Sequence, residues 1–313
     1  MRNKGIFINL KRFDVPRNQG GLCPVDDPYQ WAEYLIEESV KYGLGTLRNQ
    51  GIEVTYLMPE ALILTAVRKL KSYPENEVET LTVGCQGVYR EDIEKGGNFG
   101  AFTTNLPAKA ARNLGSSWSI IGHSEERADK KGILTSFEPV IEDNVELRKR
   151  ANDTVDKLIN QEVLRALGVD LNVLLCVGET AGQRGEGDFS KQKPRIEKVL
   201  KDQLILGLKD TVELLDKNKI VIGYEPIWAI GPGKTPPGRE YISFVSEYIR
   251  EVVKEEFGFE VSVVYGGGLK EANAKMIANI ETIDGGLVGL TKFTGQIEFE
   301  PAGLKDIINR YLE

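Results

Sequence analysis

The sequence predicts an α/β protein of the (β/α)8 barrel type, in one domain with enlarged loops. Eight short apolar runs rich in β-branched residues are spaced along the chain, helical patterns lie between them, and no linker rich in proline or serine divides the chain. Such runs are typical of buried parallel strands, and strands that alternate with helices favour a parallel sheet. An open doubly wound sheet is the alternative. The expected strands cover residues 6–8, 52–58, 81–85, 119–121, 173–177, 220–224, 261–265 and 287–288.

Helices are expected between the strands, where apolar residues recur every three or four positions. Asp27 followed by Pro28 supplies an N-cap and a first-turn proline for a helix that contains Trp31, Leu35 and Ile36. The same periodicity, typical of a helix with one buried face, covers residues 155–167, 241–252 and 304–312.

The chain length of 313 residues is compatible with one domain, residues 1–313. A barrel of this type needs about 250 residues, which leaves about 60 for the loops. We expect this excess in three insertions, at residues 11–27, 88–107 and 128–152. The last is rich in charge and predicts a solvated helix and loop.

Composition excludes several classes of function. A net charge of −7 argues against a nucleic acid or an acidic membrane as partner, and a single histidine rules out a poly-histidine metal site. Cys23, Cys85 and Cys176 form no CxxC pair and predict buried free thiols rather than a disulfide framework. No stretch is long enough for a signal-peptide core or a membrane span. We therefore expect a cytoplasmic protein that uses no cofactor and no metal.

Polar residues and glycines follow the expected strands directly. In a barrel, the carboxyl ends of the strands carry the catalytic groups. A carboxylate that takes a proton, a neutral donor that polarises a carbonyl, and a lysine with backbone N–H groups that hold a phosphate would suit proton transfer beside an anion. The residues at these ends are Asn9, Lys11, Gly122, His123, Ser124, Glu125, Glu225, Pro226, Gly266, Gly267, Gly268 and Gly289.

Each of these residues taken singly also has a structural interpretation. A lone histidine after a strand is often a hydrogen-bonded core residue, and three consecutive glycines can be a tight turn. Their joint occurrence at strand ends favours the catalytic interpretation.

Several segments resemble the triosephosphate isomerase family, and the resemblance spans nearly the whole chain. YEPIWAIGPGKTPP at residues 224–237 and IIGHSEER at 120–127 are the most specific. The others fall in the family's order and are NLK at 9–11, GCQGVYRED at 84–92, GAFT at 100–103, LCVGET at 175–180, VYGGGLK at 264–270 and DGGLVG at 284–289.

The resemblance implies a role for each catalytic residue. Glu225 would be the base that shuttles a proton between two carbons of a sugar phosphate, and neutral His123 would donate to the developing enediolate. The family is itself a standard example of an enzyme that tunes the pKa values of a glutamate base and a histidine donor to these roles. Lys11 would hold the substrate electrostatically, Asn9 would line the oxyanion side, and Glu125 would pair with Lys11.

The resemblance also implies a lid, a phosphate site and a dimer. Gly231 would offer its N–H to the phosphate, Glu179 and Trp228 would hold the open lid, and residues 100–103 would insert into a second subunit of a homodimer formed through residues 86–107. The phosphate-binding residues would be Gly231, Gly267, Gly268, Gly289 and Leu290. The lid would comprise Pro226, Ile227, Trp228, Ala229, Ile230, Gly231, Pro232, Gly233, Lys234, Thr235 and Pro236.

Departures from the family pattern concern the phosphate wall. Gly268 stands where the family usually has a serine, Leu290 where it has a second glycine, and Leu10 and Arg12-Phe13 replace the usual neighbours of Lys11. The first hypothesis is therefore an isomerase of dihydroxyacetone phosphate and D-glyceraldehyde 3-phosphate. The alternatives are an isomerase of another small sugar phosphate, such as a tetrulose phosphate, and a barrel that binds sugar phosphate without turnover.

Overall fold

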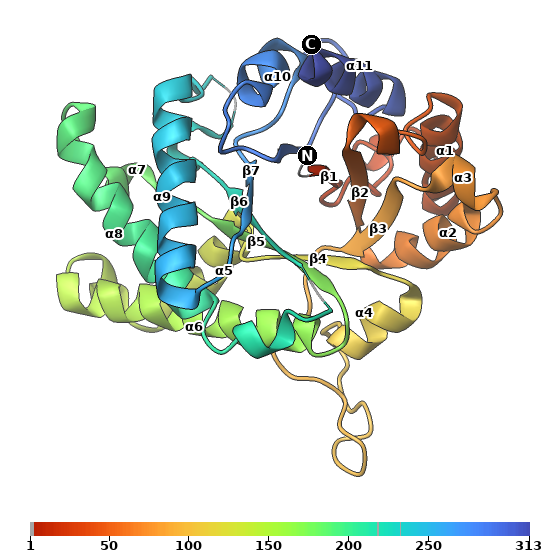
Figure 1. Cartoon of the computed structure of the whole chain (residues 1–313). Helices are drawn as coiled ribbons and strands as arrows, with labels where there is room; N and C mark the ends of the chain where they lie inside the picture. Colours follow the sequence, from red (N-terminus) through yellow and green to blue (C-terminus); the bar gives the residue numbers. More distant parts are fainter. Residues whose placement is uncertain (1–2, 218, 232) are drawn as a thin grey trace. The chain divides into compact units, whose positions relative to one another are not determined.

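The computed structural model describes residues 3–217, 219–231 and 233–313. Its strands follow one another in sequence order around a closed parallel barrel (Figure 1). The predicted barrel is therefore confirmed, and the open doubly wound sheet is wrong. The strands are β1 (Lys4–Asn9), β2 (Ile52–Met58), β3 (Leu81–Cys85), β4 (Trp118–Ile121), β5 (Asn172–Val177), β6 (Ile220–Tyr224), β7 (Ser262–Tyr265) and β8 (Gly285–Val288).

The apolar runs locate the strands well, and the early start of β8 depends on a close approach between two strands. β2, β3 and β6 have the predicted bounds. β8 begins two residues earlier than its apolar pair, at Gly285, which pairs with Gly5 of β1. A Cβ atom at Gly285 would lie 1.9 Å from the Gly5 carbonyl oxygen, so the close approach of these two strands requires glycine there.

The predicted helices are present. Asp27 Oδ1 accepts a hydrogen bond from Tyr29 N at 2.9 Å and caps the first helix. The α-helices are α1 (Pro28–Lys41), α2 (Glu60–Leu70), α3 (Glu75–Val78), α4 (Ala108–Leu114), α5 (Ser124–Phe137), α6 (Val145–Leu167), α7 (Ala181–Arg184), α8 (Phe189–Gly207), α9 (Arg239–Phe257), α10 (Glu271–Ala278) and α11 (Pro301–Leu312). The 3-10 helices are η1 (Arg17–Gln19), η2 (Arg48–Gln50), η3 (Pro139–Glu142), η4 (Val212–Leu214) and η5 (Ile227–Ala229).

Contacts within the chain define two compact units. The first comprises Met1–Gln86, Ala110–Ser119 and Val264–Glu313, and the second comprises Gly87–Lys109 and Ile120–Val263. That they form the single domain expected from the sequence stays a prediction. No helix in the described part of the chain combines the length and apolar character needed to cross a lipid bilayer.

Each unit has its own buried core. In the first, the rings of Phe7 and Trp118 meet edge to face with centroids 4.9 Å apart, and Tyr56 OH lies 2.7 Å from Ser39 Oγ. In the second, α6 packs against α8, and the amide of Asn160 donates to the carbonyl oxygen of Gly207 at 3.0 Å. The side chains of Cys23, Cys85 and Cys176 are buried, as predicted, and none of the three forms a disulfide bond within the described part of the chain.

The three predicted insertions differ in structure. Residues 11–27 contain η1, and residues 88–107 form a long loop without regular structure between β3 and α4 (Figure 1). Phe99 on this loop is 84% exposed. Residues 128–152 contain the end of α5, η3 and the start of α6, so the predicted helix and loop are present.

Candidate active site

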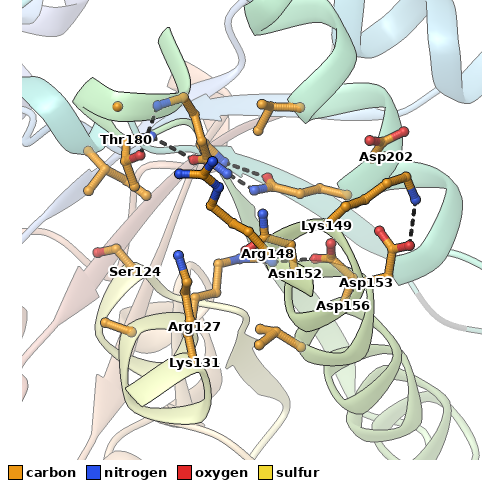
Figure 2. Close-up of a pocket in the computed structure, with 18 of the residues that line it drawn as sticks. Ser124, Arg127, Lys131, Arg148, Lys149, Asn152, Asp153, Asp156, Thr180 and Asp202 are labelled. Carbon is orange, nitrogen blue, oxygen red and sulfur yellow. Dashed lines mark hydrogen bonds and ion pairs between the residues drawn. The ribbon is translucent and has the colours of Figure 1, made fainter. Parts of the chain in front are cut away.

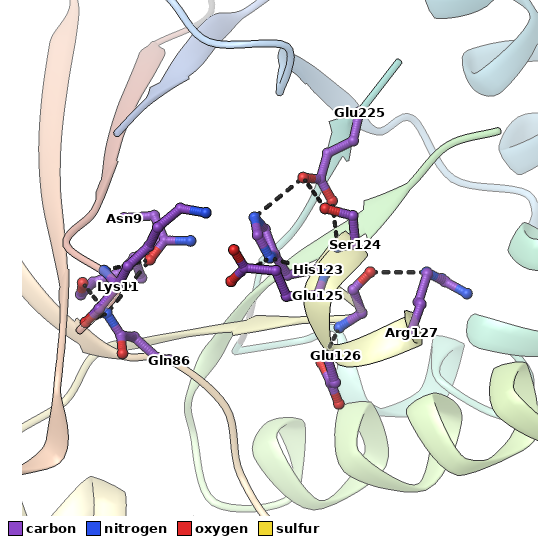
Figure 3. A network of polar contacts seen from close by, with 11 residues as sticks. Asn9, Lys11, Gln86, His123, Ser124, Glu125, Glu126, Arg127 and Glu225 are labelled. Carbon is purple, nitrogen blue, oxygen red and sulfur yellow. Dashed lines mark hydrogen bonds and ion pairs between the residues drawn. The ribbon is translucent and has the colours of Figure 1, made fainter. Parts of the chain in front are cut away.

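His123 and Glu225 lie together in the second unit. β4 ends at Ile121 and β6 ends at Tyr224, so both residues follow strands closely, as the sequence predicts. His123 Nε2 lies 3.2 Å from Glu225 Oε1, and the Glu225 side chain is 2% exposed (Figure 3). An imidazole and a buried carboxylate at this distance form a pair that can exchange a proton with a bound molecule.

Ser124 holds the Glu225 carboxylate, a role that the sequence interpretation missed. Its backbone N–H donates to Oε2 at 2.9 Å, and its hydroxyl donates to Oε1 at 3.1 Å. Ser124 directly follows His123 and begins α5, so the position itself was the available signal. Ser124 thereby holds both oxygens of the carboxylate (Figure 3).

The hydrogen bonds of His123 assign its proton. His123 is the N-cap of α5, and its Nδ1 accepts the backbone N–H of Glu125 at 3.4 Å. Because Nδ1 acts as an acceptor, the ring proton lies on Nε2, which faces Glu225. The imidazole therefore presents its Nε2–H as a donor to the same space as the carboxylate.

The surroundings of Glu225 make its carboxylate more basic than that of an exposed glutamate. Burial raises the pKa of Glu225 above the ordinary value of 4.5, and the neighbouring His123 together with the hydrogen bonds from Ser124 counteracts part of this shift. A carboxylate with a raised pKa accepts a proton more readily, which is what a general base requires.

A charged network of the half-buried Glu126 and Lys130 and the buried Glu162 supports the segment that carries His123. Glu126 Oε2 accepts the backbone N–H of Gly122 at 2.6 Å, and Lys130 Nζ lies 2.6 Å from Glu126 and 2.9 Å from Glu162. Burial and the nearby Glu126 raise the pKa of Glu162 to about 9. The sequence interpretation placed part of this network in a solvated insertion, because charge alone does not reveal burial.

Asn9 and Lys11 lie together in the first unit, at the end of β1. Asn9 Oδ1 accepts the backbone N–H of Lys11 at 3.0 Å, and Gln86 Nε2 donates to the Lys11 carbonyl oxygen at 2.9 Å (Figure 3). Lys11 has a φ of 45°, in the left-handed region that non-glycine residues rarely adopt. Gln86, another residue the sequence interpretation missed, thus helps to hold a strained backbone at a predicted site residue.

The predicted lid is tied down by a buried carboxylate. Glu179 Oε1 accepts hydrogen bonds from Trp228 Nε1 and Tyr241 OH, both at 2.7 Å, and from Tyr224 OH at 3.0 Å. The guanidinium of Arg184 lies 3.7 Å from the Trp228 ring centroid. The expected contact between Glu179 and Trp228 is confirmed, and the two tyrosines and the arginine were not foreseen.

The other predicted lid residues lie on both sides of Trp228 in the second unit. η5 spans Ile227–Ala229, and Gly231 and Gly233 have φ values of 117° and 74°, which favour glycine. Pro232, also predicted in the lid, lies outside the described residues.

The predicted phosphate wall lies in the first unit. Gly268 has a φ of 88°, so a serine there would adopt a strained backbone conformation. Leu290 is half-buried, directly after Gly289. Glycine at position 268 therefore allows a backbone conformation that a serine could adopt only with strain.

The five predicted catalytic residues fall in both units. His123, Glu125 and Glu225 belong to the second unit, and Asn9 and Lys11 belong to the first. Glu125 Oε2 lies 3.6 Å from His123 Nδ1, and its pairing with Lys11 stays a prediction. Among the residues that the structure describes, no group of three or more histidine, cysteine or carboxylate side chains could hold a metal ion.

Comparisons with known proteins agree on one family. A family model described as triosephosphate isomerase matches residues 37–300. The triosephosphate isomerase of Chloroherpeton thalassium is 38% identical over 195 residues, which are 61% of this chain and 65% of that protein. The enzyme of the same name from Alkaliphilus metalliredigens is 33% identical over 262 residues, 81% of this chain and 88% of that protein. A crystal structure of triosephosphate isomerase from Bartonella henselae superposes with a TM-score of 0.66 at 20% identity, covering 99% of this chain and 100% of the other, and shows the shared fold.

Proposed function

Because this chain belongs to the triosephosphate isomerase family of aldose–ketose isomerases, we propose that it interconverts dihydroxyacetone phosphate and D-glyceraldehyde 3-phosphate. The observation that carries the proposal is the distance of 3.2 Å between His123 Nε2 and Oε1 of the buried Glu225. A base and a neutral donor side by side are what moving a proton next to a carbonyl requires.

The proposed reaction is a proton transfer between adjacent carbons. The Glu225 carboxylate takes a proton from the carbon next to the substrate carbonyl, and the electron pair of that C–H bond forms the C=C bond of an enediolate. His123 donates its Nε2–H in a hydrogen bond to the oxygen on which negative charge develops. The protonated Glu225 then returns its proton to the neighbouring carbon, so atoms and charge balance.

Two groups would stabilise the negative charge of substrate and intermediate. Lys11 supplies an ammonium group from a residue whose own backbone is strained, and the buried Asn9 amide is fixed by hydrogen bonds. In a site from which water is excluded, a preorganised cation and dipole act more strongly than in water. We assign Lys11 to the substrate and Asn9 to the oxyanion side.

Closure of the lid would exclude water from the enediolate. In the structure, Ser124 holds Glu225 and Glu179 holds Trp228. Catalysis requires both contacts to be exchanged, so that Glu225 reaches the substrate and the lid brings the Gly231 N–H to the phosphate. The family's lid is itself a standard example of such gating.

The altered phosphate wall keeps a second substrate open. Leu290 and Gly268 replace residues that the family usually uses beside the phosphate, and either change could shift the enzyme to another small sugar phosphate, such as a tetrulose phosphate. A barrel that binds sugar phosphate without turnover is disfavoured, because Asn9, Lys11, His123 and Glu225 are all present.

Kinetics on three- and four-carbon ketose phosphates test the substrate directly. For the triose phosphate we expect kcat/KM within the usual range of about 10⁴–10⁸ M⁻¹s⁻¹. A value far below this range, together with a normal value for the tetrulose phosphate, would establish the alternative. Absence of turnover with both ketose phosphates would favour the barrel that binds sugar phosphate without turnover.

We further propose a cytoplasmic homodimer that forms through residues 86–107, with residues 100–103 inserted into the partner. Phe99 at 84% exposure supports this, because a large exposed aromatic on a loop is typical of a contact surface. Phe99→Asp should yield monomers in sedimentation velocity. Phe137→Asp, at another exposed phenylalanine on α5, is the matched control and should stay dimeric. Monomers in both variants, or in neither, would contradict this interface.

A further inference from the structure

A cavity of about 640 Å³ lies within the second unit, between α5, α6, α8 and the segment that begins α7. Figure 2 shows side chains from these elements converging on it. Insertion 128–152, to which the proposed function gives no role, supplies about a third of its lining, including Lys131, Glu142 and Arg148. The volume lies within the usual range of small-molecule sites.

The lining of the cavity contains one more cationic side chain than carboxylates. Four cations face four carboxylates in pairs: Arg127 with Asp156, Lys131 with Glu142, Lys149 with Asp153, and Lys198 with Asp202. The fifth cation is Arg148, for which no carboxylate partner is found within the described part of the chain. In a chain of net charge −7, this cavity therefore carries a local excess of positive charge.

Arg148 is well placed to bind an anion. It is half-buried on α6, and Asn152 lies four residues further on the same helical face, also lining the cavity. Lys131 approaches from α5, and its pair with the exposed Glu142 is 3.3 Å long, so this cation can turn to another anion at little cost. A guanidinium, an amide and an ammonium group around one space suit the oxygens of a phosphate.

The rest of the lining limits the body of the ligand. Apolar side chains of small size also face the cavity, and no aromatic side chain is found among its described lining residues, so there is no platform on which a base could stack. The apolar lining residues are Ala128, Val145, Val155, Val199 and Ile227.

We propose that this cavity is a second ligand site, which binds a small aliphatic phosphate monoester through Arg148 and acts on the lid. Two lining residues connect it to the candidate active site. Ser124 holds Glu225, and Ile227 begins the η5 turn of the lid. A ligand packed against both stabilises the arrangement in which Glu225 and Trp228 are held, and so lowers turnover. This coupling rests on the proposed isomerase function, whereas binding does not.

Binding is tested with n-propyl phosphate, which has no carbonyl to isomerise, by calorimetry on the full chain. The background is Lys11→Met, which removes the cation of the candidate active site. We expect one saturable site in this background, at least about tenfold weaker binding when Arg148→Met is added, and at least about fivefold weaker binding of inorganic phosphate, which lacks the propyl group.

The matched control is Arg150→Met, an exposed arginine on the same helix that does not line the cavity. It should retain binding in the same background. No saturable binding in Lys11→Met, unchanged binding in Arg148→Met, or equal loss in both arginine variants would overturn the site. Inorganic phosphate that binds as tightly as the ester would overturn the ligand class.

Coupling to the lid is tested by kcat at saturating substrate, where competition at the active site is eliminated. With Lys11 intact, saturating n-propyl phosphate should lower kcat at least about twofold in the natural sequence and in Arg150→Met, and leave it unchanged in Arg148→Met. An unchanged kcat in all three overturns the coupling. A chain without isomerase activity refutes the proposed function and the coupling, and the calorimetry then still decides the site.

Discussion

Replacing Trp228 by phenylalanine removes a donor that ties the lid to Glu179. The contact is 2.7 Å long, and the acceptor is a fully buried carboxylate. A hydrogen bond to a charged group contributes about 1.5–3 kcal/mol, and we take the lower end because Trp228 is only half-buried. Removing this contact should destabilise the held arrangement of the lid by about 1.5 kcal/mol. The Kd of an inhibitor that binds only when the lid is closed should then fall about tenfold.

The assay is the Kd of a phosphorylated hydroxamate that mimics the enediolate. Tyr241→Phe is the matched control, because Tyr241 donates to the same oxygen at the same distance from α9, outside the lid. Its Kd should stay within about twofold of that of the natural sequence. Equal tightening in both variants, or weaker binding in Trp228→Phe, would refute the conclusion that Glu179 restrains the lid through Trp228.

Four further variants test the buried carboxyl groups and the phosphate wall. Glu225→Gln should lower kcat about 10²–10⁴-fold. The pKa of Glu225 in the folded state lies above 4.5, so the natural sequence loses stability as the pH rises from 4.5 through this raised pKa. Glu225→Gln removes this loss, so its free energy of unfolding relative to the natural sequence, measured by chemical denaturation, should be larger at pH 7 than at pH 4. A gain that is equal at both pH values would contradict this. Lys130→Met should cost about 3 kcal/mol by leaving Glu126 and Glu162 without their cation, and Glu162→Gln should remove the loss of stability between pH 4.5 and about 9. Leu290→Gly should lower KM for the triose phosphate, and an unchanged KM would show that Leu290 does not crowd the phosphate.

Strands and their ends could be predicted from the sequence because the signal is local. A buried parallel strand needs an unbroken apolar run, and the residue after it faces the end of the barrel whatever its partners are. His123 and Glu225 were found in this way. The early start of β8 could not be found, since it depends on how closely Gly285 approaches Gly5 on another strand.

Residues that act through long-range partners were missed. Gln86 donates to the carbonyl oxygen of Lys11, and Lys130 pairs with both the half-buried Glu126 and the buried Glu162. Charged residues at such spacing are more often solvated, so periodicity and composition favour the wrong environment for them. Their burial follows only from the packing of α5 against α6.

The buried thiol of Cys176 can report on local opening of the structure around Glu225. Burial, with Glu225 nearby, raises the pKa of this thiol well above its ordinary value, and Cys23 and Cys85 are also enclosed. Only a thiolate attacks an alkylating reagent or an oxidant, so the folded chain should resist both. The rate at which iodoacetamide labels Cys176 thus reports how often fluctuations expose this thiol, next to Glu225, to solvent.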